Sequence, residues 1–285
     1  MPSQRASDAH HQALLESSIA AVNVAAEFIR ANAQALDRID WREKQTADFV
    51  SDIDTGAEER IRNLLASRHP EAAIRGEELA PGGPADADTV FIVDPLDGTT
   101  NFLHGYPAYA VSIGAMVEGQ LACGVVLDIP RDELFTAVRG GGAFRNGAPI
   151  RVSRVSQPGR ALIGTGFPFK NLEFLSLYLR QFERLTRAAA GLRRPGSAAL
   201  DLTSVACGRF DAFWELRLAP WDIAAGLLIV REAGGRVTDL EGRDVTPVHS
   251  PVVASNGLLH DWLLEQLAAE PEQVAPRSTA PGEQV

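Results

Sequence analysis

Long apolar runs, cysteines and lysines are all scarce in this chain of 285 residues. No apolar stretch approaches the roughly 20 residues that a bilayer-spanning helix needs. The opening MPSQRASDAHHQ lacks the apolar core of a secretory signal. The two cysteines, Cys123 and Cys207, lie in apolar surroundings without zinc-type spacing, which predicts two buried thiols and no disulfide. We therefore expect a cytoplasmic protein without a membrane segment.

Basic residues are outnumbered: 27 Lys and Arg face 37 Asp and Glu, for a formal net charge of −10, and only Lys44 and Lys170 are lysines. Nucleic-acid binding needs a basic footprint, so no direct nucleic-acid partner is expected. The surplus carboxylates either serve solubility or, in part, converge on a cation. Their positions along the chain decide between these two interpretations.

Hydrophobic periodicity predicts alternating helices and strands without a clean βαβ repeat and without G-x-G-x-x-G. Helices are predicted over about 9–36, from a Thr55–Glu58 capping box to 68, 173–190, 197–207, 221–233 and 258–267. Strands are predicted over 90–93, 161–165, 211–216, 252–254, and within 108–138 with turns at 118–120 and 129–133. The pattern indicates an α/β or α+β sandwich. One domain is expected over 1–268, with an exposed loop at 81–88 and a disordered tail at 269–285.

Two acids lie three residues apart directly after the apolar run 90–93, in the segment DPLDGTTN (94–101). Pro95 fixes the backbone between Asp94 and Asp97, and Gly98 frees the turn after them. Both carboxylates and the Leu96 carbonyl can thus point at one place, and such oxygen ligands suit Mg²⁺. Thr99 and Thr100 begin a possible short helix that would favour a phosphate. The structural alternative is that the acids cap a turn and Thr99 caps a helix.

Two further acids, Glu77 and Asp222, also lie at an end of a predicted strand or helix. Glu77 comes just after AAI (72–74), an expected short strand, and Asp222 lies in the first turn of the apolar helix that begins at WDIAAG. Alone, Glu77 is explained as a solvated loop acid and Asp222 as a helix cap. A metal site is therefore predicted only from all of these acids together.

The chain resembles the inositol monophosphatase family of lithium-sensitive, magnesium-dependent phosphatases. The segments that carry this resemblance, in the family's order and spacing, are GEE (76–78), DPLDGTTNF (94–102), GSAALDL (196–202), FDAFWEL (210–216) and WDIAAG (221–226). The resemblance spans about residues 12–267. It implies an α-β-α-β-α sandwich of the α+β class, two to three Mg²⁺ ions, a small phosphate monoester as substrate, and a homodimer.

The resemblance also implies roles for individual residues. The implied metal ligands are Glu77, Asp94, the Leu96 carbonyl, Asp97 and Asp222. The implied substrate contacts are Asp97, Gly98, Thr99, Gly196, Ser197 (threonine in many relatives), Ala198 and Glu215. Glu77 and Thr99 are implied to orient a water for metal-assisted hydrolysis without a covalent phosphoenzyme. Lys44 and Asp54, in KQTADFVSDID, match an upstream supporting strand after a one-residue gap; the alternative for Lys44 is an exposed loop lysine.

Thr100 stands where the 3′-phosphonucleotidase branch typically has lysine, and Glu215 stands at the polyol-contacting position. Both features favour inositol 1-phosphate as substrate. Fructose 1,6-bisphosphate and histidinol phosphate stay open, because neighbouring branches share the metal site and differ in the leaving-group pocket. A member that acts chiefly as a binding partner in transcription or RNA processing is the alternative from another class, although the complete ligand set favours catalysis.

Overall fold

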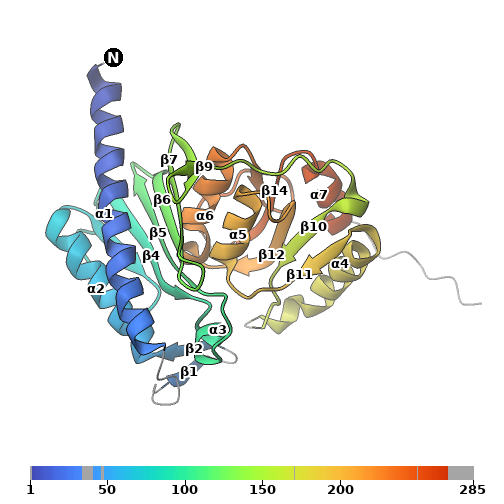
Figure 1. Cartoon of the computed structure of the whole chain (residues 1–285), viewed down its shortest axis with the longest axis horizontal. Coiled ribbons are helices and arrows are strands. Elements are labelled where there is room, and N and C mark those ends of the chain that lie inside the picture. Colours follow the sequence, from blue (N-terminus) through green and yellow to red (C-terminus); the bar gives the residue numbers. More distant parts are fainter. Residues whose placement is uncertain (1, 34–40, 46–47, 170, 249, 269–285) are drawn as a thin grey trace, which may run out of the picture.

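The computed structural model describes residues 2–33, 41–45, 48–169, 171–248 and 250–268, which form five layers of helices and sheets (Figure 1). The first β layer is a seven-stranded sheet in the order β3-β4-β5-β6-β7-β8-β9, and the second is a five-stranded sheet in the order β11-β10-β12-β14-β13. A small hairpin of β1 and β2 stands apart from both sheets. The predicted α-β-α-β-α sandwich of the α+β class is confirmed.

The strands of the large sheet are β3 (Ala73–Gly76), β4 (Thr89–Asp97), β5 (Ala110–Val117), β6 (Gln120–Asp128), β7 (Glu133–Val138), β8 (Gly142–Arg145) and β9 (Ala148–Pro149). Those of the small sheet are β10 (Leu162–Thr165), β11 (Gly191–Arg193), β12 (Ala212–Leu218), β13 (Arg236–Thr238) and β14 (Ser250–Ser255). The hairpin pairs β1 (Trp41–Gln45) with β2 (Asp48–Ser51). The predicted hairpin turns at 118–120 and 129–133 are confirmed.

Helices α1 (Pro2–Asn32) and α2 (Asp52–Arg68) cover the outer face of the large sheet, and α5 (Ala198–Ala206) and α6 (Pro220–Glu232) fill the middle layer. The outer face of the small sheet carries α4 (Leu175–Ala188) and α7 (His260–Ala268), while the short α3 (Thr99–Leu103) follows β4. Within the described ranges, no helix has the length and apolar content to cross a bilayer.

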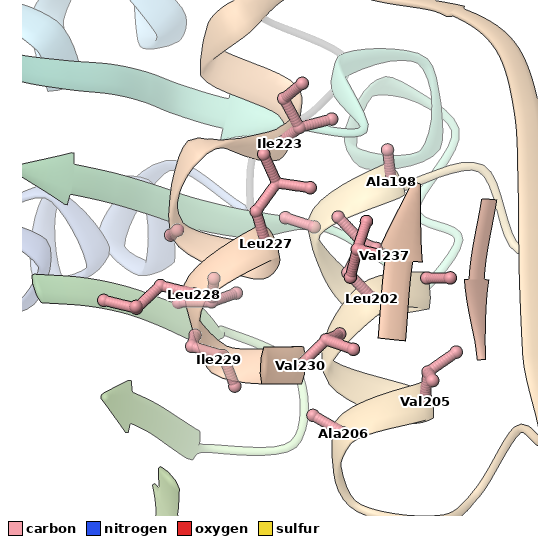
Figure 2. Packing of buried hydrophobic residues seen from close by; sticks show 14 of the residues in the cluster. Ala198, Leu202, Val205, Ala206, Ile223, Leu227, Leu228, Ile229, Val230 and Val237 are labelled. Carbon is pink, nitrogen blue, oxygen red and sulfur yellow. The ribbon is translucent and has the colours of Figure 1, made fainter. Parts of the chain in front are cut away.

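Three hydrophobic clusters occupy the interfaces between the layers. Strand β4 shows how the layers form, because Phe91 and Val93 pack towards α1 and α2 while Ile92 packs towards the middle layer. A strand buried on both faces has no polar positions to alternate, which explains the uniformly apolar run 90–93. The middle-layer cluster joins α5 and α6 through Leu202, Ile223 and Leu227 (Figure 2).

Close packing fixes the position of α6 against both of its neighbours. A Cβ added to Gly226 would lie 2.5 Å from Leu202 Cδ1 of α5, and one added to Gly124 of β6 would lie 2.8 Å from the Ala225 carbonyl oxygen. Only glycine permits these approaches. The N-terminal turn of α6, which carries Asp222, is thereby held beside the large sheet.

Several predicted boundaries are wrong. The first helix begins at Pro2 and ends at Asn32 rather than spanning 9–36. The second helix begins at Asp52 with Ser51 and Asp54 as its capping box, not Thr55 and Glu58, because the Asp54 carboxylate reaches back to the Ser51 N–H at 2.8 Å. Strand β4 continues through Asp97 instead of ending at Asp94.

Both cysteines are free thiols, but only Cys123 is buried, whereas Cys207 is partly exposed because it caps the C-terminus of α5. The predicted tail at 269–285 lies outside the described residues.

Candidate active site

A β-bulge in β4 brings two aspartates to one face of the sheet. Asp94 pairs with Ser112 of β5 but Asp97 pairs with Ala110, so β4 contains one extra residue over this stretch. Residues three apart in a regular strand point to opposite faces, and the extra residue reverses that alternation. Asp94 and Asp97 therefore both face the middle layer, while Leu96 packs in the outer cluster with α1 and α2.

Asp222 joins this pair from α6. Its Oδ2 accepts a 2.6 Å hydrogen bond from the Ala219 N–H, so the capping role considered as a structural alternative is real. The carboxylate nevertheless also faces the sheet. One oxygen from each of Asp94, Asp97 and Asp222 can be chosen so that all three lie within 4.8 Å of one another.

Glu77 reaches the same place from β3. Gly76 pairs with Val93 in parallel register, so the next residues of both strands, Glu77 and Asp94, come side by side. Both line the pocket described below. The expected short strand over 72–74 is present as β3, but it spans Ala73–Gly76 and ends one residue before Glu77.

Crowding of these acids raises their affinity for protons. Burial raises the pKa of Asp94 well above its usual value, and the nearby carboxylates of Glu77, Asp97 and Asp222 raise it further. Burial likewise raises the pKa of Asp222, again reinforced by Glu77 and Asp97. Like charges in a desolvated site disfavour ionisation unless a cation offsets them. The cluster is therefore electrostatically incomplete without a positive charge.

A pocket of about 390 Å³ opens over the cluster. It collects most of the residues predicted to form the site: Glu77, Asp94, Leu96, Asp97, Gly98, Thr99, Gly196, Ser197, Ala198, Glu215 and Asp222. These residues come from both sheets and from α3, α5 and α6. Of the two predicted supporting residues, Asp54 lies behind Thr99, whereas the side chain of Lys44 in β1 lies outside the described residues.

Asp97 connects the acid cluster to α5. Its Oδ2 accepts hydrogen bonds from Ser197 Oγ at 2.6 Å and from the Ala199 N–H at 2.8 Å. Ser197 is also the N-cap of α5, where its Oγ accepts from the Leu200 N–H at 3.3 Å. The predicted Gly196–Ala198 segment is thus fixed directly beside Asp97.

The predicted short helix after the acids is present as α3, but its cap is Gly98 rather than Thr99. Gly98 has φ 95°, and a Cβ there would lie 2.8 Å from the Ala108 carbonyl oxygen, so glycine is required on both counts. The Thr99 hydroxyl is thereby released from capping. It lies 2.7 Å from Asp54 Oδ1 and 3.1 Å from the Leu96 carbonyl oxygen.

Sequence reasoning gave no site role to several residues that line the pocket: Asn101, Gly166, Phe167, Phe169, Arg194, Asp201 and Arg217. Asp201 is 2% exposed, and its Oδ1 has no hydrogen-bond partner within the described part of the chain. Its spacing of four from Ser197 on α5 was a usable signal. Arg194, which stacks over Phe167 and Phe169 at 5.2 and 5.0 Å from the ring centroids, gave none, because that contact joins distant segments.

The donor set fits Mg²⁺. It consists of hard carboxylate oxygens and one backbone carbonyl, without cysteine or histidine, and the raised pKa values of Asp94 and Asp222 call for a cation. A sandwich of this topology with such an acidic pocket is typical of a metal-dependent phosphatase.

Comparison with known proteins defines the family. The model of the inositol monophosphatase family matches residues 10–272. A Pseudomonas aeruginosa protein named Nus factor SuhB is 45% identical over 249 residues, covering 86% of this chain and 92% of its own. The crystal structure of the extragenic suppressor protein suhB from Bartonella henselae superposes with a TM-score of 0.87 at 40% identity, covering 90% of this chain and 98% of its own. An inositol monophosphatase from Anabaena superposes with a TM-score of 0.80 at 36% identity, covering 90% and 95%. The chain belongs to the inositol monophosphatase family, and it is a magnesium-dependent phosphatase.

Proposed function

We propose that the chain hydrolyses a small polyol or sugar phosphate, with inositol 1-phosphate as the leading substrate and two to three Mg²⁺ ions as cofactor, in the cytoplasm. The observation that carries this proposal is the shared pocket of the acid cluster and Glu215. A phosphate at the acids would leave its alcohol half within reach of Glu215. A carboxylate accepts hydrogen bonds from hydroxyl groups, which suits a polyol better than an apolar leaving group.

Glu77, Asp94, the Leu96 carbonyl, Asp97 and Asp222 would hold the ions. When bound, Mg²⁺ neutralises charge on the phosphate oxygens and lowers the pKa of water. The protein's own contribution is orientation. The Thr99 hydroxyl donates towards Asp54, so a lone pair of its oxygen can accept a hydrogen bond from the attacking water. Glu77 would accept a hydrogen bond from the other proton of this water, and the N–H groups of Gly98 and Thr99 would hold the phosphate.

The leaving-group side of the pocket is formed by Gly196, Ser197, Ala198 and Glu215. Fructose 1,6-bisphosphate and histidinol phosphate are the competing substrates. Arg194 and Arg217 line the same pocket and would favour a second anionic group, as in a bisphosphate. Substrate choice thus depends on whether Glu215 or these arginines dominate recognition.

A phosphate-release assay over a panel of monoesters, with Mg²⁺ and with chelator, tests the proposal. The panel is inositol 1-phosphate, fructose 1,6-bisphosphate, histidinol phosphate and p-nitrophenyl phosphate. The proposal expects Mg²⁺-dependent release with the highest kcat/KM for inositol 1-phosphate. A highest kcat/KM for another ester would refute the substrate assignment, and release unaffected by chelator would refute the role of the acid cluster.

Lithium inhibition is a second property that the family resemblance supports. Lithium is close to magnesium in size and carries half its charge, so it would occupy an ion site without stabilising the phosphate. Titration of lithium at fixed Mg²⁺ and substrate should abolish most activity. Full activity at tens of millimolar lithium would contradict this assignment.

We also propose a homodimer. Leu172, Leu175 and Leu179 are 59%, 38% and 53% exposed and recur at three- and four-residue steps on the α4 side of the molecule. Leu175 and Leu179 lie four residues apart on α4, with Leu172 in the 3-10 turn just before it, and such an exposed apolar stripe suits a protein interface. Light scattering of the wild type against Leu179→Glu should show a dimer and a weakened dimer, respectively. A monomeric wild type would refute the proposal.

A binding role in transcription is the second candidate function, because the relative at 45% identity is named a Nus factor. The net charge of −10 favours a protein partner over nucleic acid. A binding assay with purified RNA polymerase of the same organism tests this role. Binding that persists in Asp94→Asn would separate it from catalysis, and no binding would exclude this partner.

A further inference from the structure

Glu58 of α2 is a fully buried carboxylate that accepts two hydrogen bonds from the segment after Glu77 and one from Arg62 of its own helix. The residue is 0% exposed. Its Oε2 accepts from the Glu78 N–H at 2.7 Å, and its Oε1 accepts from the Leu79 N–H at 3.2 Å. A buried charge is tolerated only when it is paired and hydrogen-bonded. Glu58 therefore keeps its hydrogen bonds only while residues 78 and 79 stay in this position.

Arg62 lies one turn further along α2 and binds the same segment, so Glu58 and Arg62 together form an anchor for residues 78–80. Its Nε lies 2.9 Å from Glu58 Oε1, and its Nη2 donates to the carbonyls of Leu79 at 3.3 Å and Ala80 at 2.6 Å. Glu58 and Arg62 thus bind both N–H groups and carbonyls of the segment that follows β3. The backbone from residue 78 to residue 80 is held at four points by two side chains of one helix.

Gly76 lets this anchor approach the strand. A Cβ on Gly76 would lie 2.0 Å from Glu58 Oε1 and 2.6 Å from Oε2, closer than any side chain could be accommodated without displacing the carboxylate. Gly76 is the last residue of β3 and pairs with Val93, the residue before Asp94. The Glu58 carboxylate therefore touches the backbone on both sides of Glu77.

We propose that Glu58 is a positioning residue that fixes Glu77 in the metal site by clamping the residues before and after it. The proposal rests on the ligand role proposed for Glu77. Glu58 itself takes no part in the pocket, which its carboxylate does not line. Partners that orient a metal ligand typically affect metal affinity by about 10- to 100-fold when removed.

The test compares wild type, Glu58→Gln and Gly76→Ala, with Glu59→Gln as matched control, because Glu59 is the exposed neighbour on the same helix. Titration calorimetry with Mg²⁺ alone measures the affinity for the ion. Hydrogen exchange measures the exchange rates of the Glu78 and Leu79 amides. Glu58→Gln and Gly76→Ala should each weaken Mg²⁺ binding by about tenfold or more and speed exchange at both amides. Glu59→Gln should behave as wild type.

The double variant Glu58→Gln/Gly76→Ala makes the test sharper. Both changes break the same contact, so the loss in the double variant should be smaller than the product of the two single losses. Independent, multiplying losses would overturn the clamp.

Faster amide exchange with unchanged Mg²⁺ binding would also overturn the proposal, since it would show an anchor that does not position Glu77. If Glu58→Gln fails to fold, Gly76→Ala gives the same readouts by itself. A wild type that does not bind Mg²⁺ would refute the proposed function as a whole, which is distinguishable from a failure of the clamp alone.

Discussion

Thr99 Oγ1 lies 2.7 Å from Asp54 Oδ1, a hydrogen bond that joins the start of α3 to the start of α2 across 45 residues of sequence. The other oxygen of Asp54 accepts from the Ser51 N–H at 2.8 Å and from Ser51 Oγ at 2.5 Å. One carboxylate therefore caps a structural helix and orients a hydroxyl in the pocket. The Thr99 hydroxyl has acceptors for its proton in Asp54 Oδ1 at 2.7 Å and the Leu96 carbonyl oxygen at 3.1 Å, and its own oxygen keeps lone pairs for a water in the pocket.

This geometry predicts that Thr99→Val lowers kcat by roughly 100-fold, the size of effect that follows when a reacting group is misplaced by about 1 Å, while KM changes little. The substitution keeps the shape of the side chain and removes the acceptor. Thr99→Ser is the control and should retain most activity, because it keeps the hydroxyl. Steady-state kinetics at saturating Mg²⁺ give kcat and KM for both variants and for the wild type. A Thr99→Val enzyme with near wild-type kcat would contradict the water-orienting role.

Asp94→Asn should separate activity from stability. The amide keeps the 3.0 Å hydrogen bond from the Leu96 N–H to Oδ1 but removes a charge from the acid cluster. Turnover should fall by about a thousandfold or more, because metal-assisted catalysis contributes several kcal/mol. The metal-free variant should unfold at a higher urea concentration than the metal-free wild type at pH 7, because one of the mutually repelling carboxylates has lost its charge. Near wild-type activity at saturating Mg²⁺, or a destabilised metal-free protein, would contradict this account.

The sign of that stability effect follows from the raised pKa of Asp94. Burial and the neighbouring carboxylates raise its folded-state pKa above the unfolded-state value. The folded protein then binds more protons than the unfolded chain between those two pKa values, so stability falls as pH rises through that window. At neutral pH the charged cluster destabilises the metal-free fold.

Magnesium binding should accordingly release protons and strengthen with pH. Cation binding requires ionised carboxylates, and the raised pKa values of Asp94 and Asp222 keep these groups protonated to a higher pH than ordinary aspartates. Calorimetric titration of Mg²⁺ at pH 6 in two buffers of different ionisation enthalpy measures the released protons. Apparent affinity should rise from pH 6 to pH 8, and Asp94→Asn should release fewer protons. Heats that do not depend on the buffer would contradict the prediction.

The layered fold was predictable from the sequence because most of its elements are marked by local patterns. The apolar run 90–93 indicated a strand buried on both faces, and the helix predicted over 221–233 matches α6 (Pro220–Glu232) to within one residue at each end. The bulge between Asp94 and Asp97 was not predictable in detail. It depends on the register with β5, where Asp94 pairs with Ser112 and Asp97 with Ala110.

The wrong capping box has a physical reason. Ser51-x-x-Asp54 and Thr55-x-x-Glu58 both match the motif, and local sequence does not decide between them. Glu58 is engaged by the amides of Glu78 and Leu79, about 20 residues away, so it is unavailable as a cap. Long-range contacts with Phe167 and Phe169 likewise place Arg194 at the pocket, where local sequence gave no indication.

Glu215→Gln should separate substrate recognition from chemistry. Glu215 lies on β12 and packs closely on Gly166, where a Cβ would be 2.1 Å from its carboxylate, so the side chain is fixed on the wall of the pocket away from β4. If it accepts hydrogen bonds from substrate hydroxyls, its removal leaves the acids of β4 and α6 in place. Loss of about 1.5–3 kcal/mol of charged hydrogen bonding should lower kcat/KM for inositol 1-phosphate by roughly ten- to a hundredfold.

The control for Glu215→Gln is p-nitrophenyl phosphate, which has no hydroxyl groups on its leaving group. Its hydrolysis should change little, because a site built around hydroxyls discriminates only against ligands that leave its polar groups unpaired. Asp94→Asn serves as the opposite control and should lower hydrolysis of both esters alike. Equal losses on both esters in Glu215→Gln would place Glu215 in the metal site or the core, and its role in selecting a polyol would be refuted.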